Sequence, residues 1–412
     1  MKPRVLLLAH RVPYPPDRGD RIRCWHLLRT LAEHANVSLA AIADEPVAPA
    51  SRDQLAQVCQ QVCLPRLQRL PRLCRGAVNL ARRRSVSEGM FYSPALAKTV
   101  AAWQTQQPFD AVIVYCSSMF PYVATPAWSQ TPIFVDLIDV DSQKWTDYAD
   151  QAPLFKRWLY RREARTVGQL EARIVATADG IALTTPGEAA VLKSQLPDAQ
   201  PQVMTNGVDF CHFQPATAAV PGRITFVGVL NYWPNVQGIL WFVEHVWDRL
   251  RAAFPAATLE IVGRQPCRQL LRLDQQRNIR ICADVADIRP HLAAAEVAIA
   301  PLQIARGIQN KVLEALAMER AVVASPAVCR GLAARPGEHL LCATTATEWV
   351  AHLQHLLTDS AARLRLATAG RRFVETHHDW THCLEPLRQW LAARTGPSSA
   401  SIKPELAWTG NA

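Results

Sequence analysis

The sequence lacks a long apolar run, and this argues against a membrane-spanning helix. A span needs about 20 mainly apolar residues in a helix. The longest stretch without charge, between Asp110 and Asp136, contains three prolines and many polar residues. Near the amino terminus only Val5–Ala9 is continuously apolar, which is too short for the core of a signal peptide. We therefore expect a cytoplasmic protein whose first apolar run is a buried strand.

Glycine and paired cysteines are also scarce. Seventeen glycines in 412 residues exclude a collagen-like repeat. The eleven cysteines are odd in number and include no C-x-x-C pair, so we expect isolated buried thiols. Two histidine groups, at 352–355 and 377–382, lack the acidic or cysteine partners of a metal site. We expect neither a metal nor a cofactor.

The net charge of +10 comes from 38 arginines and 7 lysines against 35 acidic residues. No zinc-finger, RNP or heptad pattern accompanies this excess, and it is spread over both halves of the chain. We therefore expect no nucleic-acid partner. Phosphate-bearing ligands or an anionic membrane surface suit the charge better.

Short apolar runs alternate with helical periods along nearly the whole chain, which predicts parallel sheets covered on both faces by helices. The pattern stops at Asn206–Gly207–Val208–Asp209, where turn residues and prolines begin, and then restarts. We predict two facing Rossmann-like domains with a deep cleft between them. Their expected bounds are 1–205, a linker at 206–222, 223–375, a C-terminal helix at 376–395 and a disordered tail at 396–412.

In open α/β sheets, ligands bind at the carboxyl ends of the strands. The loop after the first strand offers Gly19, Asp20 and Arg21 at a helix start, a candidate acceptor or phosphate loop. A later strand ends at Asp139 and Asp141, which could supply a general base or an orienting carboxylate. Ordinary helix capping is the simpler explanation of either loop.

Two loops of the second domain are candidates for binding a phosphate-bearing ligand. Gly228 ends a strand and Asn231 follows in the same loop. In the stretch 306–315, Gly307 frees the backbone, Lys311 supplies a cation and Glu314 lies one turn further on. Such a constellation suits a diphosphate at the helix start and a ribose diol on the carboxylate. A surface Lys–Glu pair is the simpler alternative.

A basic stretch without any acid lies between Asp53 and Glu88. Arginines beside leucines favour docking on anionic lipid, whereas Pro65 and Pro71 speak against a helix and leave a solvated flank as the alternative. The arginines concerned are Arg66, Arg69, Arg72, Arg75, Arg82, Arg83 and Arg84.

At these loops the sequence resembles the retaining GT-B glycosyltransferases of family 4 over roughly residues 1–390. The resemblance rests on DLIDVDS, on NGVD at 206–209, on FVGVLNYWPN and on NKVLEALAMERAVVAS at 310–325. Within that family it is most similar to the exopolysaccharide sugar transferases of exosortase (PEP-CTERM) clusters, through RVPYPPDRGDRIRCWHLLRTLA and ARGIQNKVLEALAM.

The resemblance implies a nucleotide-sugar donor in the second domain, a saccharide or polyprenyl-linked acceptor in the first, and metal-independent transfer. It assigns Glu314 to the donor ribose. The family's other glutamate falls on Arg306, and its usual Arg and Lys fall on Val229 and Asn235. The diphosphate charge is then expected to be met by Lys311, Arg306 and Arg264.

The leading hypothesis is therefore a transferase at the inner membrane face. A nucleotide-sugar epimerase of the same fold, or a non-catalytic nucleotide-sugar-binding subunit of a polysaccharide assembly complex, remains the alternative.

Overall fold

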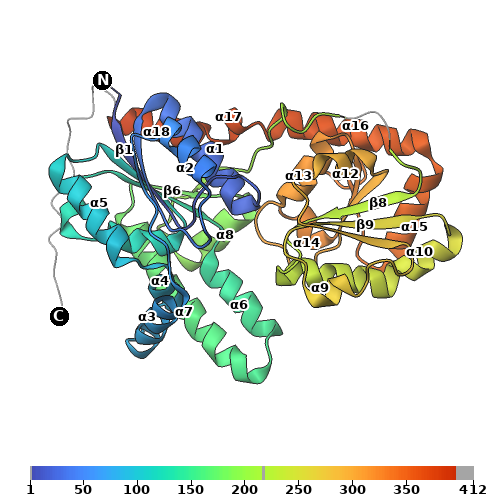
Figure 1. Ribbon diagram of the computed structural model, residues 1–412, viewed down its shortest axis with the longest axis horizontal. Coiled ribbons are helices and arrows are strands. Elements are labelled where there is room, and N and C mark those ends of the chain that lie inside the picture. The colour runs from blue at the N-terminus through green and yellow to red at the C-terminus, as the bar shows by residue number, and fades with distance from the viewer. Residues whose placement is uncertain (1, 216–218, 396–412) are drawn as a thin grey trace.

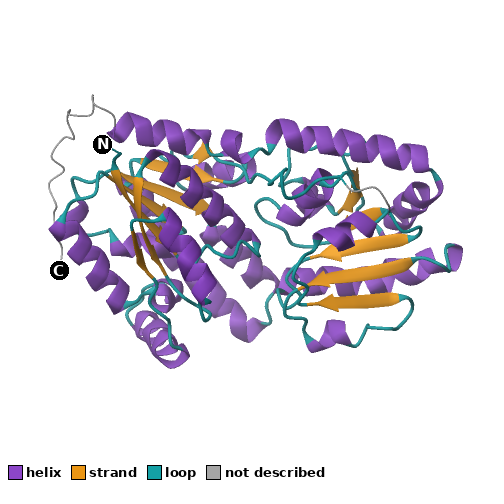
Figure 2. Cartoon of the chain, turned by 45° about the horizontal axis from the view of Figure 1, so that its top comes forward, coloured by secondary structure: helices purple, strands orange, loops and turns teal. Residues whose placement is uncertain are grey.

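The computed structural model describes residues 2–215 and 219–395, which form two α/β domains (Figures 1 and 2). Each domain is built on one parallel sheet, which confirms the predicted fold class. The first sheet has the order β3-β2-β1-β4-β5-β6-β7 and the second β10-β9-β8-β11-β12-β13. The strands are β1 (Arg4–Ala9), β2 (Asn36–Ala41), β3 (Gln61–Cys63), β4 (Ala111–Tyr115), β5 (Ile133–Ile138), β6 (Gly180–Leu183), β7 (Gln202–Val203), β8 (Arg223–Val227), β9 (Thr258–Gly263), β10 (Ile279–Ala283), β11 (Val297–Ala300), β12 (Ala321–Ala324) and β13 (Leu341–Cys342).

Helices cover both faces of each sheet (Figure 2). In the first domain they are α1 (Gly19–His34), α2 (Pro49–Val58), α3 (Arg69–Ala81), α4 (Val86–Phe91), α5 (Pro94–Gln106), α6 (Asp141–Gln151), α7 (Leu154–Thr177) and α8 (Pro186–Gln195), with 3-10 turns at Ser117–Tyr122 and Pro126–Trp128. In the second they are α9 (Trp233–Phe242), a π turn at Val243–Trp247, α10 (Asp248–Ala253), α11 (Arg268–Leu271), α12 (Arg289–Ala294), α13 (Asn310–Ala317), α14 (Pro326–Cys329), α15 (Ala346–Thr358) and α16 (Ser360–His377).

The central strands are buried on both faces because the helices leave no face to water. Val5 to Ala9 of β1 have no exposed surface, and β4 and β5 are nearly as dry. This explains why these strands read as continuous apolar runs rather than alternating ones. No helix among residues 2–215 and 219–395 has the length and apolarity to cross a bilayer.

The C-terminal part of the chain returns to the first domain. α16 runs along the second domain, and then α17 (Trp380–Cys383) and α18 (Glu385–Thr395) pack on the first, as Figure 1 shows. Trp380 and Trp390 belong to the core of the first domain. The predicted helix at 376–395 is thus two helices that complete the other domain. The predicted tail at 396–412 lies outside the described residues.

The chain passes between the two domains twice, and the two connecting segments lie side by side. Val208, in the predicted linker, forms a β-bridge with Asp379, and the carbonyl of Asn206 accepts a hydrogen bond of 2.7 Å from His378 Nδ1. A Cβ at Gly207 would collide with the ring of Trp380. The domains are therefore joined by two bonded segments rather than by one free linker.

A buried ion pair fixes the start of α1 against this junction. Arg23 is 1% exposed, and its Nε donates to Asp136 Oδ2 of β5 at 2.8 Å. Its Nη1 donates to Thr205 O at 3.0 Å and to Asn206 Oδ1 at 2.9 Å. The sequence places Arg23 beside a candidate phosphate loop, whereas the structure puts it inside the domain.

We predict that Arg23→Met destabilises the protein by about 3–5 kcal/mol, because Asp136 then remains buried without its cation. Urea unfolding of Arg23→Met measures this loss. Arg29→Met, on the exposed side of the same helix, is the control and should shift the midpoint little. An unchanged midpoint in Arg23→Met would show that the pair is not needed for stability.

Candidate functional site: a candidate anion site at the domain interface

Two helix N-termini meet at the interface between the domains. α1 of the first domain begins at Gly19, and α13 of the second begins at Asn310. A Cβ at Gly19 would lie 3.7 Å from Asn310 Nδ2, so the two helix ends are in contact distance. Asn310 Nδ2 has no hydrogen-bond partner among the described residues. Each helix N-terminus carries positive partial charge and free amides, so the pair favours an anion between them.

Lys311 provides a basic side chain in the first turn of α13. Lys311 Nζ donates to Asn235 Oδ1 at 2.6 Å and lies 4.6 Å from the centre of the Phe226 ring. A Cβ at Gly228 would come within 3.1 Å of Lys311 Nζ, so glycine lets the lysine reach the end of β8. The structure thus brings together Gly228 and Lys311, two of the predicted donor-binding residues.

Glu314 lies one turn beyond Lys311 and is 7% exposed. Burial raises the pKa of Glu314 to about 7, against the opposing effect of the Lys311 charge. Burial likewise lowers the pKa of Lys311 to about 7, although Glu314 acts to raise it. A lysine and a carboxylate that titrate near neutrality at a helix start are a candidate ligand site rather than a surface pair.

At Gly307 the loop before α13 packs closely against the first domain. Its φ is +59°, and a Cβ would overlap Asp139 Oδ1 and lie 3.1 Å from Thr184 Oγ1. Asp139 follows β5 and accepts a hydrogen bond of 3.2 Å from Thr184 Oγ1. Burial, with Glu188 nearby, raises the pKa of Asp139 to about 6. A carboxyl with this pKa is suited to accept or hold a proton in the cleft.

Arg306 and Arg264 bridge the two domains. Arg306 Nε is 2.5 Å from Asp147 Oδ2 of α6, and Arg306 Nη1 is 2.9 Å from Glu188 Oε1 of α8. Arg264, after β9, pairs with Asp17 of the first domain. Both arginines are predicted to meet the donor diphosphate, and in this structure first-domain carboxylates occupy them instead.

Ion pairs between residues of the loop after β1 fix the conformation of this loop. Asp20 pairs with Arg11 at 2.7 Å and Arg18 at 3.1 Å, and lies 3.4 Å from His10 Nε2. Burial acts to raise the pKa of Asp20, but His10, Arg11 and Arg18 outweigh it and hold the pKa far below its usual range.

Arg21 is buried and pairs with Asp17, Asp44 and Glu45 at 3.2–3.7 Å. Of the predicted loop residues Gly19, Asp20 and Arg21, only Gly19 faces α13, and the two side chains hold the loop in shape. Asn231, predicted for donor binding, donates to Gln265 Oε1 at 2.7 Å on the exposed rim.

Sequence reasoning missed Lys144 on α6. Asp141 begins this helix and accepts from Ser117 Oγ at 2.8 Å. Lys144 lies one turn on and Tyr148 the next, so they share a face. Tyr148 OH is 3.5 Å from Tyr232 OH of the second domain, so this face looks across the cleft. Burial acts to lower the pKa of Lys144, but Asp141 and the two tyrosines raise it overall, so the lysine stays charged. The signal was the i, i+3, i+7 spacing of Asp141, Lys144 and Tyr148.

A group with metal-ligand geometry also escaped the sequence analysis. Glu260, Cys282 and His291 place their ligand atoms within 4.8 Å of one another. In this structure Glu260 is paired with His291 at 3.0 Å and with Arg223 at 3.7 Å. The histidines weighed from the sequence are used otherwise: His378 bonds Asn206 O, and His352 lies 3.2 Å from Cys342 O.

Residues 221–359 match the family model described as "Glycosyl transferases group 1". This match covers 139 of the 412 residues, all of them in the second domain. The match spans β8 to the first residue after α15 and includes Gly228, Lys311 and Glu314. No curated protein sequence matches the chain.

Solved structures support the two-domain GT-B fold of this chain. Sucrose-phosphate synthase from Thermosynechococcus elongatus is 17% identical, with a TM-score of 0.70 over 94% of this chain and 98% of that one. HepE from Anabaena, solved with UDP and glucose, is 14% identical, with a TM-score of 0.68 over 95% and 99%. A Rickettsia africae glycosyltransferase is 11% identical, with a TM-score of 0.63 over 97% and 100%.

We predict that Gly307→Ala lowers the turnover of the protein at least tenfold, because a Cβ collides with Asp139 and strains the backbone by about 1–3 kcal/mol. Gly337→Ala is the matched control: its φ is +86°, but a Cβ there meets nothing within 4 Å. Steady-state turnover of both variants, normalised to folded protein, tests this. Equal losses in the two variants would show that strain alone, and not the contact with Asp139, is responsible.

Proposed function

We propose that the protein transfers a sugar from a nucleoside-diphosphate sugar to a saccharide or a polyprenyl-linked saccharide in exopolysaccharide synthesis. The observation that carries the proposal is the meeting of the α1 and α13 N-termini beside Lys311 and the buried Glu314. Two helix ends and a lysine suit a diphosphate, and a buried carboxylate one turn away suits a ribose diol. The bound UDP of Anabaena HepE agrees with this donor class.

The chemistry proposed needs charge where the diphosphate leaves. Negative charge develops on that leaving group, and fixed cations and amides stabilise it without reorganisation. Lys311 supplies one charge from the second domain, and Lys144 supplies another from the first when the cleft is closed. Lys144 thus compensates for Val229 and Asn235, where the resembling family carries cations.

The acceptor is proposed to enter from the first domain. Asp139, whose pKa is raised toward neutrality, is the candidate to orient or deprotonate the acceptor hydroxyl, and Asp141 lies beside it at the start of α6. Retention of configuration is proposed from the resemblance to family 4. A polyprenyl-linked acceptor would place the enzyme at the inner face of the cytoplasmic membrane.

The test of this function is a panel of nucleoside-diphosphate sugars, assayed for release of nucleoside diphosphate with membrane extract as acceptor. We expect release from at least one donor in the presence of a chelator, because Lys311, Lys144 and two helix ends supply the positive charge. Activity that chelator abolishes and magnesium or manganese restores would contradict metal independence. Interconversion of donors without release would indicate the epimerase instead.

We predict that Lys311→Ala and Glu314→Ala each weaken donor binding about ten- to a hundredfold, since a charge-assisted hydrogen bond contributes roughly 1.5–3 kcal/mol. Calorimetry with the donor identified by the panel measures this. Lys193→Ala, an exposed lysine of α8, is the control. Unchanged affinity in both cleft variants would refute the site.

The same pair predicts a pH dependence. Below pH 7 Lys311 is charged and Glu314 neutral, whereas above pH 7 the lysine loses its proton and the glutamate becomes an anion. The net charge facing the diphosphate falls from +1 to −1, so donor affinity should fall as the pH rises through about 7. Lys311→Ala should flatten this profile. An equally steep profile in that variant would assign the dependence to other groups.

A further inference from the structure

An apolar and basic surface projects from the first domain. It is formed by α3 and the first half of α7, which extend below the sheet in Figure 1. Of the twelve large apolar side chains that stand exposed among the described residues, six belong here, and Leu154, Phe155 and Trp158 are 81%, 78% and 68% exposed. We call this surface the α3/α7 face. Its exposed apolar members are Leu70, Leu73, Val78, Leu154, Phe155 and Trp158.

The two helices are fixed against each other. Arg162 Nη2 of α7 donates to Leu80 O and Arg84 O, both at 3.0 Å, at the end of α3. Leu70, Leu73 and Leu80 follow one stripe of α3, because they are spaced at i, i+3 and i+10. The sequence suggested that Pro71 would interrupt a helix, but it lies in the first turn of α3, where a missing N–H costs nothing.

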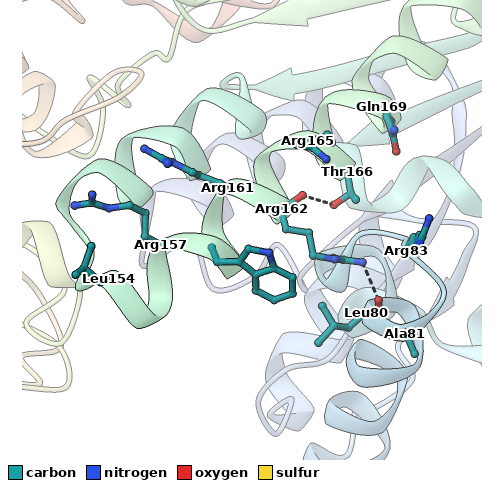
Figure 3. Close-up of a pocket in the computed structure, with 11 residues that line it drawn as sticks. Leu80, Ala81, Arg83, Leu154, Arg157, Arg161, Arg162, Arg165, Thr166 and Gln169 are labelled. Atoms are coloured by element: carbon teal, nitrogen blue, oxygen red, sulfur yellow. Dashed lines mark hydrogen bonds between the residues drawn. The ribbon is translucent and has the colours of Figure 1, made fainter.

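A groove of about 830 Å³ lies between α3 and α7 (Figure 3). Its apolar walls are Leu80, Leu154 and Trp158. Figure 3 shows the basic side chains along its length. They are Arg83, Arg157, Arg161, Arg162 and Arg165.

The positive charge of this face is largely uncompensated. No acid occurs between Asp53 and Glu88 in the sequence. Glu163 is the acid nearest in sequence on α7. It lies 3.8 Å from Arg162 Nη1, and it accepts hydrogen bonds from Ser85 Oγ at 2.6 Å and from two amides of α4. Asp150 reaches only Arg161, at 4.0 Å. Among the residues described, Arg83, Arg157 and Arg165 form no ion pair.

We propose that the α3/α7 face docks on an anionic phospholipid bilayer, with Leu154, Phe155 and Trp158 entering the interface and the arginines of the groove binding lipid phosphates. Exposed apolar side chains beside arginines are what a bilayer surface requires: a shallow apolar layer below a layer of negative headgroups. A free anion would use the arginines but leave the apolar side chains in water.

The fold gives this docking a direct relation to the cleft. α6 begins at Asp141 in the cleft and ends at Gln151, three residues before α7 begins at the α3/α7 face. Its eleven residues span about 16 Å. The headgroup region would then lie about one helix length from Asp139 and Lys144. The relevance of this distance rests on the proposed function, because it assumes a lipid-linked acceptor. The docking of the α3/α7 face on a bilayer does not depend on that function.

The test is co-sedimentation of the full chain with vesicles of phosphatidylcholine alone or with 30% phosphatidylglycerol, without any sugar. The first variant is Arg157→Gln/Arg161→Gln/Arg165→Gln. We expect at least tenfold weaker binding to anionic vesicles, since each basic residue contributes about fivefold near such a surface. Raised salt should weaken the wild type similarly. Arg268→Gln/Arg272→Gln/Arg280→Gln removes the same charge from exposed positions of the second domain and should bind like wild type.

The second variant tests the apolar part. Leu154→Ser/Phe155→Ser/Trp158→Ser should also bind at least tenfold more weakly. Leu271→Ser/Leu364→Ser, at exposed leucines outside the α3/α7 face, should bind like wild type. Lipids brominated in the acyl chains should quench wild-type fluorescence more than that of Trp158→Phe.

Equal sedimentation with neutral and anionic vesicles, equal losses in the control variants, or loss with the arginine variant alone would each overturn the proposal; the last would indicate a simple anion site. A failed donor panel beside intact vesicle binding would refute the proposed function and leave docking established.

Discussion

A hydrogen-bonded chain through Asn206 holds the two halves of the cleft in register. Arg23, neutralised by Asp136 inside the first domain, donates to Asn206 Oδ1, and Asn206 Nδ2 donates to Asn310 Oδ1 at 2.8 Å. Asn310 begins α13, which carries Lys311. Because the first link is buried and charged, it cannot be lost without leaving Asp136 unpaired. The position of the donor-side helix thus depends on an ion pair in the core of the other domain.

Ion pairs between the two domains add to the hydrogen bonds through Asn206. Arg306 and Arg264 of the second domain meet carboxylates of the first, and each pair spans the cleft. These pairs hold the domains together without using Lys311, which lies deeper and bonds only the neutral Asn235 among the described residues. The N-termini of α1 and α13 and the side chain of Lys311 therefore stay available for an anionic ligand. It also assigns Arg306 an interdomain role where the resembling family has a glutamate.

Helices α6 and α7 form a hairpin that connects the domain interface with the α3/α7 face. α6 carries Asp141, Lys144 and Tyr148 to the cleft, and α7 turns back with exposed apolar and basic residues at its start. An exposed apolar and basic surface without a partner among the described residues is typical of an interaction site, which agrees with the proposed docking. The same hairpin therefore connects the site of transfer with the surface where the acceptor is proposed to reside.

The two parallel sheets could be predicted from the amino-acid sequence, because strands buried on both faces must be continuously apolar, as Val5–Ala9 is. The sequence also located the loops after the strands, including Gly307 and Lys311, since local spacing marks a strand end and a helix start. The partners of the charged residues required the tertiary structure. Arg23 and Arg306 are ordinary helix or loop residues locally, and their roles arise from carboxylates that lie 113 residues away for Arg23 and 159 and 118 residues away for Arg306. Such pairings follow from how the domains pack, which no local pattern encodes.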